Sequence, residues 1–391
     1  MISPRAYLDH NATSPVRPEV VEAVARALAL PGNPSSVHAE GRAARAALEK
    51  ARAQVGALVG AGPGRVVFTS GGTEAANAVL SGGLRRTGEA APTRLVIGAT
   101  EHPCVAAGHR FPADRVDVIP VDARGVVDCA ALRIILDRHR EEGVLVSVHA
   151  ANNETGVIQP LAEIVALARD HGRALVHSDA VQAVGKIPLS FVHLGLDALT
   201  LSGHKFAAPK GVGAVVLAEG ITLEAVPLRG GGQEGRLRAG TENLPGLVGM
   251  GVAAEIAAAH LGQTHEMARQ EEVRDSIAAG LRRLAPDLAV FGAGAPRLPN
   301  TLSFSIPGLD APTAVMHLDL AGVAVSSGSA CASGKVARSP VLAAMGVSPA
   351  LAAGALRVSL GWNSTTSDGT RCLAACERLI EALYRRRGQA A

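Results

Sequence analysis

The sequence predicts an α/β protein in which a largely parallel sheet, covered by helices on both faces, is joined to a smaller α+β domain. Short β-like runs alternate with amphipathic helical stretches, the pattern of parallel strands joined by crossover helices. Most of these runs are apolar at every position, as strands are when helices cover both faces. The 391 residues exceed one core of ordinary size, so two domains sharing a cleft are expected.

The expected elements follow in chain order. Helices are predicted over 39–59 and 161–171, and a long helical region over about 244–284, after a glycine-rich stretch at 230–232. The predicted strands are 66–69, 94–97, 145–148, 174–177, 198–201 and 214–217.

Shorter strands and helices return from residue 300 onward, which places the second domain there. We expect residues 16–260 to form the large domain. Residues 1–15 and 261–391 are expected to form the small one, because Tyr7-Leu8-Asp9 joins it from the N-terminus.

Composition and charge exclude several classes of protein. Apolar residues make up 48% of the chain and charged residues 19%, as in ordinary globular proteins, and the net charge is only +3. No Lys/Arg cluster is long enough to indicate a nucleic-acid or membrane partner. The N-terminus has no charged region followed by an apolar one, and no apolar run approaches the roughly 18 residues that span a bilayer. A cytoplasmic protein is therefore expected.

The cysteines are odd in number and form no CxxC pair, so neither a disulfide framework nor a zinc site is predicted. They are Cys104, Cys129, Cys331, Cys372 and Cys376.

Lys205 is the first candidate for a catalytic residue. The chain holds only five lysines, and this one follows the predicted strand 198–201 within Ser202-Gly203-His204-Lys205. An amine whose pKa is lowered by burial or by neighbouring charge can form an imine with an aldehyde, whereas a guanidinium cannot. The placement predicts a lysine that binds pyridoxal phosphate (PLP). The alternative is a surface lysine on a turn.

A second candidate is the glycine-rich turn Ser70-Gly71-Gly72-Thr73-Glu74, which follows the strand 66–69 and opens a helix. Glycines expose backbone N–H groups, and a helix N-terminus favours an anion, so this turn is typical of a phosphate cup. An ordinary strand-to-helix turn with threonine as the cap is the alternative.

Asp179 and Gln182 follow the strand 174–177, where ligands of open α/β sheets bind. A carboxylate beside a pyridine nitrogen keeps that nitrogen protonated, which makes the ring an electron sink. Gln182 can donate to the ring phenolate oxygen. The alternative is an aspartate that caps a helix, beside an exposed glutamine.

His102 and Asn153 complete the set of polar residues after strands. His102 can stack on the cofactor ring and move protons, or it is a loop histidine with a satisfied hydrogen bond. Asn153 can bind either the ring oxygen or the carboxylate of a substrate.

Taken together, these motifs resemble cysteine desulfurases of PLP fold type I, in the class V aminotransferase group, over residues 6 to 363. That fold implies a mainly parallel seven-stranded sheet. The motifs that carry the resemblance are Tyr7-Leu-Asp9, Gly32-Asn-Pro-Ser-Ser36, Thr69-Ser-Gly-Gly-Thr-Glu74, Asn152-Asn-Glu-Thr-Gly156, Asp179-Ala-Val-Gln182, Ser202-Gly-His-Lys205, Arg238-Ala-Gly-Thr241 and Ser326-Ser-Gly-Ser-Ala-Cys331.

The resemblance implies a role for each residue. Lys205 would hold PLP covalently, Asp179 would pair with the pyridine nitrogen, and His102 would stack on the ring. Arg357, with Asn33, would clamp the substrate carboxylate, a task that suits a bidentate guanidinium. The phosphate would be bound by Thr73, Ser202 and His204, joined by Thr241 from the second subunit of a homodimer.

Cys331 decides the reaction that the resemblance implies. It lies among small and hydroxyl residues, in a segment expected to be mobile, and is the candidate nucleophile, with His102 as proton acceptor. L-cysteine would be converted to L-alanine while its sulfur passes to Cys331 as a persulfide. No resident metal is predicted, although the persulfide would be placed to contact a nascent cluster on a scaffold partner.

Other activities share part of this pattern. A selenocysteine lyase or another class V lyase would use Lys205 and Asp179 without a mobile thiol. An aminotransferase would need a keto acid, and a protein without activity would only bind sulfur-carrier partners. The sulfur would go to iron–sulfur cluster assembly or to thio-modification of tRNA or DNA. Ser178 and the stretch 335–340, which lacks the usual Glu-Pro pair, depart from the family pattern.

Overall fold

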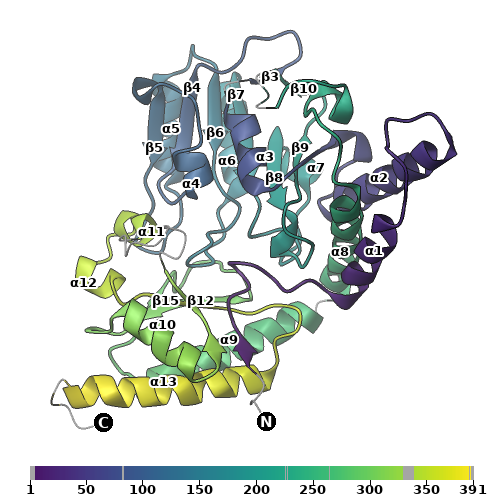
Figure 1. Ribbon diagram of the computed structural model, residues 1–391. Helices are drawn as coiled ribbons and strands as arrows, with labels where there is room; N and C mark the ends of the chain where they lie inside the picture. Colours follow the sequence, from purple (N-terminus) through teal and green to yellow (C-terminus); the bar gives the residue numbers. More distant parts are fainter. Residues whose placement is uncertain are drawn as a thin grey trace.

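A large sheet covered by helices forms one part of the molecule and a smaller sheet with long helices forms the other, seen above and below in Figure 1. Both termini lie beside the smaller part. The computed structural model describes residues 5–81, 83–224, 226, 228–263, 265–328, 339–386 and 388.

The large sheet has seven strands in the order β2-β9-β8-β7-β6-β4-β5. Only β9 runs against the others, because it pairs antiparallel with both β2 and β8 while the remaining pairs are parallel. The mainly parallel seven-stranded sheet is thus confirmed. Its strands are β2 (Val66–Thr69), β4 (Arg94–Gly98), β5 (Val116–Ile119), β6 (Val144–Ser147), β7 (Ala174–Asp179), β8 (Ala198–Ser202) and β9 (Gly213–Leu217).

Alternate residues of each strand enter different apolar clusters, since side chains of a strand point to opposite faces. In β4, Val96 belongs to the cluster beneath α2, α5, α6 and α8, whereas Leu95 and Ile97 belong to the cluster beneath α3 and α4. Both faces are therefore buried, as the apolar runs predicted. The helices are α1 (Pro18–Leu28), α2 (Ala39–Leu58), α3 (Gly72–Leu80), α4 (Pro103–Ala106), α5 (Cys129–Arg138), α6 (Leu161–His171), α7 (Phe191–Leu194) and α8 (Leu244–Gln263).

Helix α8 corrects one expectation from the sequence. With 20 residues, it is long and apolar enough to cross a membrane by length and composition, although no apolar run was expected to approach that length. Half of its most apolar window is buried inside the fold, where α8 packs against α1 and α2. Its apolar surface is thus that of a core helix.

The smaller sheet is antiparallel, in the order β11-β12-β15-β14. The first strand of the chain, β1 (Ala6–Tyr7), pairs in parallel with β13 (Val323–Ala324) beside it. The remaining elements are β3 (Leu84–Arg86), β10 (Ile221–Leu223), β11 (Ala289–Phe291), β12 (Thr301–Ser305), β14 (Ser326–Ser327), β15 (Leu356–Ser359), α9 (His265–Leu284), α10 (Ala311–Leu320), α11 (Pro340–Ala344), α12 (Pro349–Ala352) and α13 (Thr366–Arg386).

We propose the domain division expected from the sequence, 16–260 against 1–15 and 261–391. The apolar clusters support it. One small-domain cluster joins Ala6 and Leu8 to residues between Val273 and Tyr384. The cluster under α2 and α8 draws almost entirely on the proposed large domain, with Leu298 as an exception.

A buried ion pair fixes the segment after β10 against the edge of the large sheet. Arg52 of α2 donates to both carboxylate oxygens of Glu234, at 2.6 and 2.8 Å, and the Glu234 side chain is only 1% exposed. Glu234 Oε2 also accepts from the Phe68 backbone N–H at 2.8 Å. Each oxygen therefore has a partner, which a buried carboxylate requires.

Glu234→Ala is expected to lower the free energy of unfolding by about 3–5 kcal/mol, because the buried Arg52 guanidinium loses its bidentate partner and keeps only the half-exposed Glu49, whose Oε2 lies 3.0 Å from Nε. Glu219→Ala is the control, since the side chain of Glu219 pairs with Arg65 but is 91% exposed. That change should cost less than about 1 kcal/mol. Denaturant unfolding of the two variants measures both values, and equal losses would contradict the role of the buried pair.

Candidate active site

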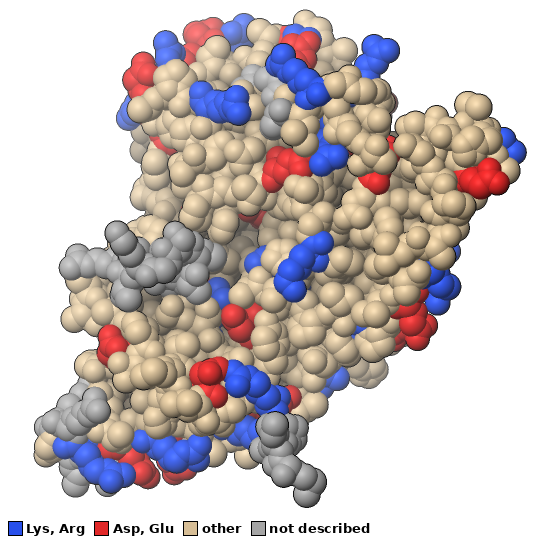
Figure 2. Space-filling model, viewed as in Figure 1, with Lys and Arg blue, Asp and Glu red and all other residues tan. Residues whose placement is uncertain are grey.

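A cavity of about 250 Å³ lies beyond the carboxyl ends of β7 and β8, between the two parts of the molecule. Figure 2 shows the surface hollowed there. Most of the residues predicted for the site line this cavity: Gly72, Thr73, His102, Asn153, Asp179, Gln182, Ser202, His204, Lys205 and Arg357. The structure therefore brings together polar residues that follow separate strands.

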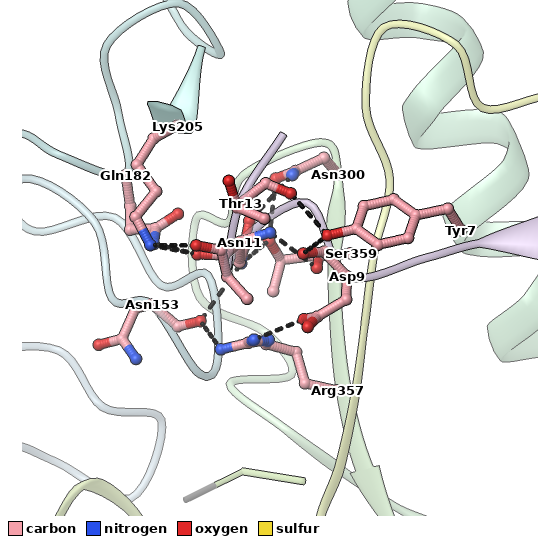
Figure 3. Close-up of polar contacts among 12 residues, drawn as sticks. Tyr7, Asp9, Asn11, Thr13, Asn153, Gln182, Lys205, Asn300, Arg357 and Ser359 are labelled. Atoms are coloured by element: carbon pink, nitrogen blue, oxygen red, sulfur yellow. Dashed lines mark hydrogen bonds and ion pairs between the residues drawn. The ribbon is translucent and has the colours of Figure 1, made fainter. Parts of the chain in front are cut away.

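Lys205 lies in the short 3-10 helix that follows β8. Its Nζ donates to the backbone carbonyls of Asn11 and Ala12, at 2.7 and 2.9 Å (Figure 3). The amine is half-buried on the cavity wall, held by the segment that follows β1. This is the position that a lysine needs to bond a carbonyl compound inside the cavity.

Asp179 ends β7 and is buried. Its Oδ1 accepts from the Val181 backbone N–H at 2.9 Å, and the Cys104 thiol lies 3.7 Å from Oδ2. Burial raises the pKa of Asp179, because the interior disfavours the charged form. A protonated ring nitrogen beside Asp179 would favour the charged form of this carboxylate.

His102 caps α4, and its Nδ1 accepts from the Cys104 backbone N–H at 3.1 Å. Burial lowers the pKa of His102, so the ring is neutral, and this bond leaves its proton on Nε2. In that tautomer the other ring nitrogen is a donor. The proton-accepting role predicted for His102 therefore requires Nδ1 to give up the Cys104 amide.

The N-terminus of α3 lines one end of the cavity with Gly72 and Thr73. Gly72 is needed there, because an added Cβ would lie 2.8 Å from Val181 Cγ2 and 3.3 Å from Ser202 Cβ. His204 also lines the cavity, with Nδ1 3.2 Å from Thr13 Oγ1, and burial lowers its pKa to about 4. A neutral histidine and the N–H groups of a helix start can donate hydrogen bonds to a phosphate.

Arg357 of β15 lies at the opposite wall. Its guanidinium donates to Asp9 Oδ1 at 2.8 Å and to the Asn153 backbone carbonyl at 3.0 Å (Figure 3). Its buried Nε has no hydrogen-bond partner among the residues that the structure describes. A buried donor of this kind is suited to a carboxylate that enters the cavity.

Two predicted site residues, Asn33 and Thr241, do not line the cavity of their own chain. Asn33 is exposed, and its side chain accepts from the Ser35 backbone N–H at 2.8 Å. Thr241 is also exposed and lines a separate depression beside Ser70. Cys331 lies outside the described residues.

Several residues of the site were not predicted. Cys104 and His149 line the cavity, and Asn11 lies beside Lys205. His149 Nδ1 lies 2.9 Å from the buried carboxylate of Glu101, which also accepts from the His149 backbone N–H at 2.7 Å. Glu101 stands next to His102 in the sequence. Its charge beside the predicted histidine was the one sequence feature that could have indicated these additional site residues.

PLP fits this arrangement on three counts. The cavity offers an amine for its aldehyde, a helix start for its phosphate and, for its ring nitrogen, a buried carboxylate that forms no ion pair with the residues that the structure describes. The fold and the site together define a PLP-dependent enzyme of fold type I.

Comparison with known proteins supports the assignment to PLP-dependent enzymes of fold type I. The aminotransferase class-V family model matches residues 6–371. The chain is 38% identical over 384 residues to "Cysteine desulfurase IscS" of Dictyoglomus turgidum, covering 96% of this chain and 95% of that protein. It is 41% identical over 390 residues to "IscS-like cysteine desulfurase" of Mycobacterium tuberculosis, covering 98% and 97%.

The solved structure of a NifS-like protein from Rickettsia africae superimposes with a TM-score of 0.86 at 31% identity, covering 96% of this chain and 99% of that one. This chain belongs to the class V aminotransferase family. The resemblance to cysteine desulfurases and the dependence on PLP, both predicted from the motifs, are confirmed.

His149→Gln should cost more stability at pH 6 than at pH 9. Glu101 raises the pKa of His149 against the opposing effect of burial. A raised pKa stabilises the fold below the unfolded value of about 6.5, and this contribution is lost as the pH rises through the folded value.

Denaturant unfolding of the wild-type protein and of His149→Gln at pH 6 and at pH 9 measures the stability cost of the substitution at each pH. The exposed His193 provides the control, since His193→Gln is expected to show no such dependence. A cost of His149→Gln that is the same at both pH values would contradict the ion pair.

Proposed function

We propose that this chain is a cysteine desulfurase, which converts L-cysteine to L-alanine and transfers the sulfur to Cys331 as a persulfide. The observation that carries the proposal is the convergence of Lys205 and Asp179, from the ends of neighbouring strands, on one cavity. Relatives of nearly full coverage that are named cysteine desulfurases support the substrate.

PLP, when bound, accepts the electrons that are released at the α-carbon of the substrate. Asp179 would hold the ring nitrogen in its protonated form, and Gln182 would donate to the phenolate oxygen. Lys205 Nζ would hold the cofactor covalently, and as a free amine it would remove the α-proton of L-cysteine. Thr73, Ser202 and His204 would bind the phosphate.

Arg357 orients the substrate by its carboxylate. Asp9 and the Asn153 carbonyl hold the guanidinium in place, and the buried Nε provides a donor. Fixing the carboxylate fixes the direction of the bond from the α-carbon to its hydrogen, which Lys205 must reach. Asn153 also offers its side-chain amide to the substrate or to the ring oxygen.

Cys331 takes the sulfur. Its thiolate attacks the sulfur of the substrate, an S–S bond forms, and the substrate Cβ–S bond breaks with its electron pair passing to carbon. Protonation of that carbon gives L-alanine, and His102 exchanges protons with the sulfur groups. The persulfide then passes to an acceptor protein, for iron–sulfur cluster assembly or for thio-modification.

The enzyme is further proposed to act as a cytoplasmic homodimer. Thr241 and Asn33 lie outside the cavity of their own chain, and both are exposed. A second subunit that brings Thr241 to the phosphate would complete the site.

Cys331→Ala is expected to lower sulfide release from L-cysteine, in the presence of a thiol reductant, by at least about 1,000-fold, because the sulfur loses its nucleophile. Wild-type protein should release alanine and sulfide in equal amounts. Cys129→Ala is the control, since burial raises the pKa of Cys129 to about 11 and leaves its thiol unreactive.

Each alternative gives a different result in this assay. Full activity of Cys331→Ala would indicate a selenocysteine lyase or another class V lyase. Conversion of an added keto acid to its own amino acid, without release of sulfide, would indicate an aminotransferase.

A further inference from the structure

Lys186 is a buried lysine that the proposed mechanism does not use. It follows Gln182 by four residues, and its side chain donates to two amide oxygens, Gln182 Oε1 at 2.6 Å and Asn11 Oδ1 at 2.8 Å. Lys186 is only 8% exposed and is not among the residues that line the 250 Å³ cavity. Lys186 therefore hydrogen-bonds to two residues that line the cavity, Gln182 and Asn11, without lining it itself.

These bonds fix which end of the Gln182 amide faces which way. An amide carries an acceptor at one end and a donor at the other, and a lysine that donates selects the acceptor end. The opposite end, Nε2, donates to the Asn11 backbone carbonyl at 3.0 Å. A carbonyl can only accept, so Gln182 has the same orientation imposed at both ends.

The amide of Asn11 is constrained in the same way. Its Oδ1 accepts from Lys186 and from Asn300 Nδ2, the latter at 3.1 Å. Its Nδ2 donates to the Asn153 backbone carbonyl at 3.2 Å and to Thr301 Oγ1 at 2.9 Å (Figure 3). The Asn11 backbone carbonyl, which accepts from Gln182, therefore has a fixed position.

That orientation matters at the cavity. Gln182 lines the cavity wall three residues after Asp179, and its Nε2 carries a second hydrogen besides the one given to Asn11. A phenolate oxygen of a bound cofactor is an acceptor. The reversed amide would set its own oxygen against that charge, which is unfavourable in a buried site.

We propose that Lys186 is a positioning residue that holds the Gln182 amide with its donor toward the cofactor phenolate. The inference rests on the proposed PLP chemistry of this site. Lys186 acts through Gln182 and touches neither substrate nor cofactor.

The test is a double-mutant cycle in the PLP-loaded enzyme, with Lys186→Met, Gln182→Ala and the double variant. The measurement is the pH midpoint of the absorbance change of bound PLP. Lys186→Met should raise the midpoint by about one unit, the effect of losing one hydrogen bond to a charged oxygen, because an unsupported phenolate binds its proton more tightly. In the Gln182→Ala background the same change should add less than about 0.3 units.

Lys50→Met, at an exposed position of α2, is the matched control and should leave the midpoint unchanged. A Lys186→Met midpoint equal to that of the control would overturn the proposal. A shift of full size in the Gln182→Ala background would overturn it too, since Lys186 would then act independently of the amide.

Thermal unfolding of the cofactor-free variants shows whether each one folds. If Lys186→Met does not, Lys186→Gln retains an N–H donor at this position. For Lys186→Gln, a pH midpoint within about 0.3 units of the wild-type value would support the proposal, and a shift of about one unit would refute it. Failure of the desulfurase function appears in wild-type protein as absent sulfide release, whereas failure of this inference appears only in the comparison of variants.

Discussion

The contact between the Lys205 amine and the carbonyls of Asn11 and Ala12 is the interaction on which the site depends. Lys205 follows a strand of the large sheet, whereas the chain around Asn11 bonds to Thr301 and Ser359 of the smaller one. One short segment therefore joins the reactive amine to both parts of the molecule (Figure 3). A shift between those parts would move the carbonyls away from the amine, so the cavity is correctly formed only when both are in place.

The large sheet supplies the second constraint. Because β6, β7 and β8 are parallel, the polar residues that follow them meet at one edge, where Asp179 and Lys205 share a cavity. This geometry was predictable from the sequence, since the buried strands are apolar runs that end in polar residues. The edge strand β5 was not predicted, because Asp117, which pairs with Arg94 of the neighbouring β4 at 2.9 Å, interrupts its apolar run.

The hydrogen bonds by which Asn11 and Lys186 hold the site residues in place could not be predicted from the sequence. Asn11 and Lys205 are 194 positions apart, and Asn11 and Lys186 are 175 apart. No local pattern marks an asparagine as a buried link between sheets or a lysine as the partner of an amide, because only tertiary contacts create those roles. Thr241 and Asn33 are different, since a single chain does not bring either to the cavity, and the role proposed for Thr241 is that of a residue from a second subunit.

The central claim, that the amine of Lys205 binds PLP, is tested most directly by borohydride reduction of the PLP-loaded protein, followed by peptide mass spectrometry. We expect a stable pyridoxyl group on Lys205 and on no other lysine of the wild-type protein, and none on any lysine of Lys205→Ala. A pyridoxyl group on another lysine of the wild-type protein, or the absence of any adduct, would contradict it.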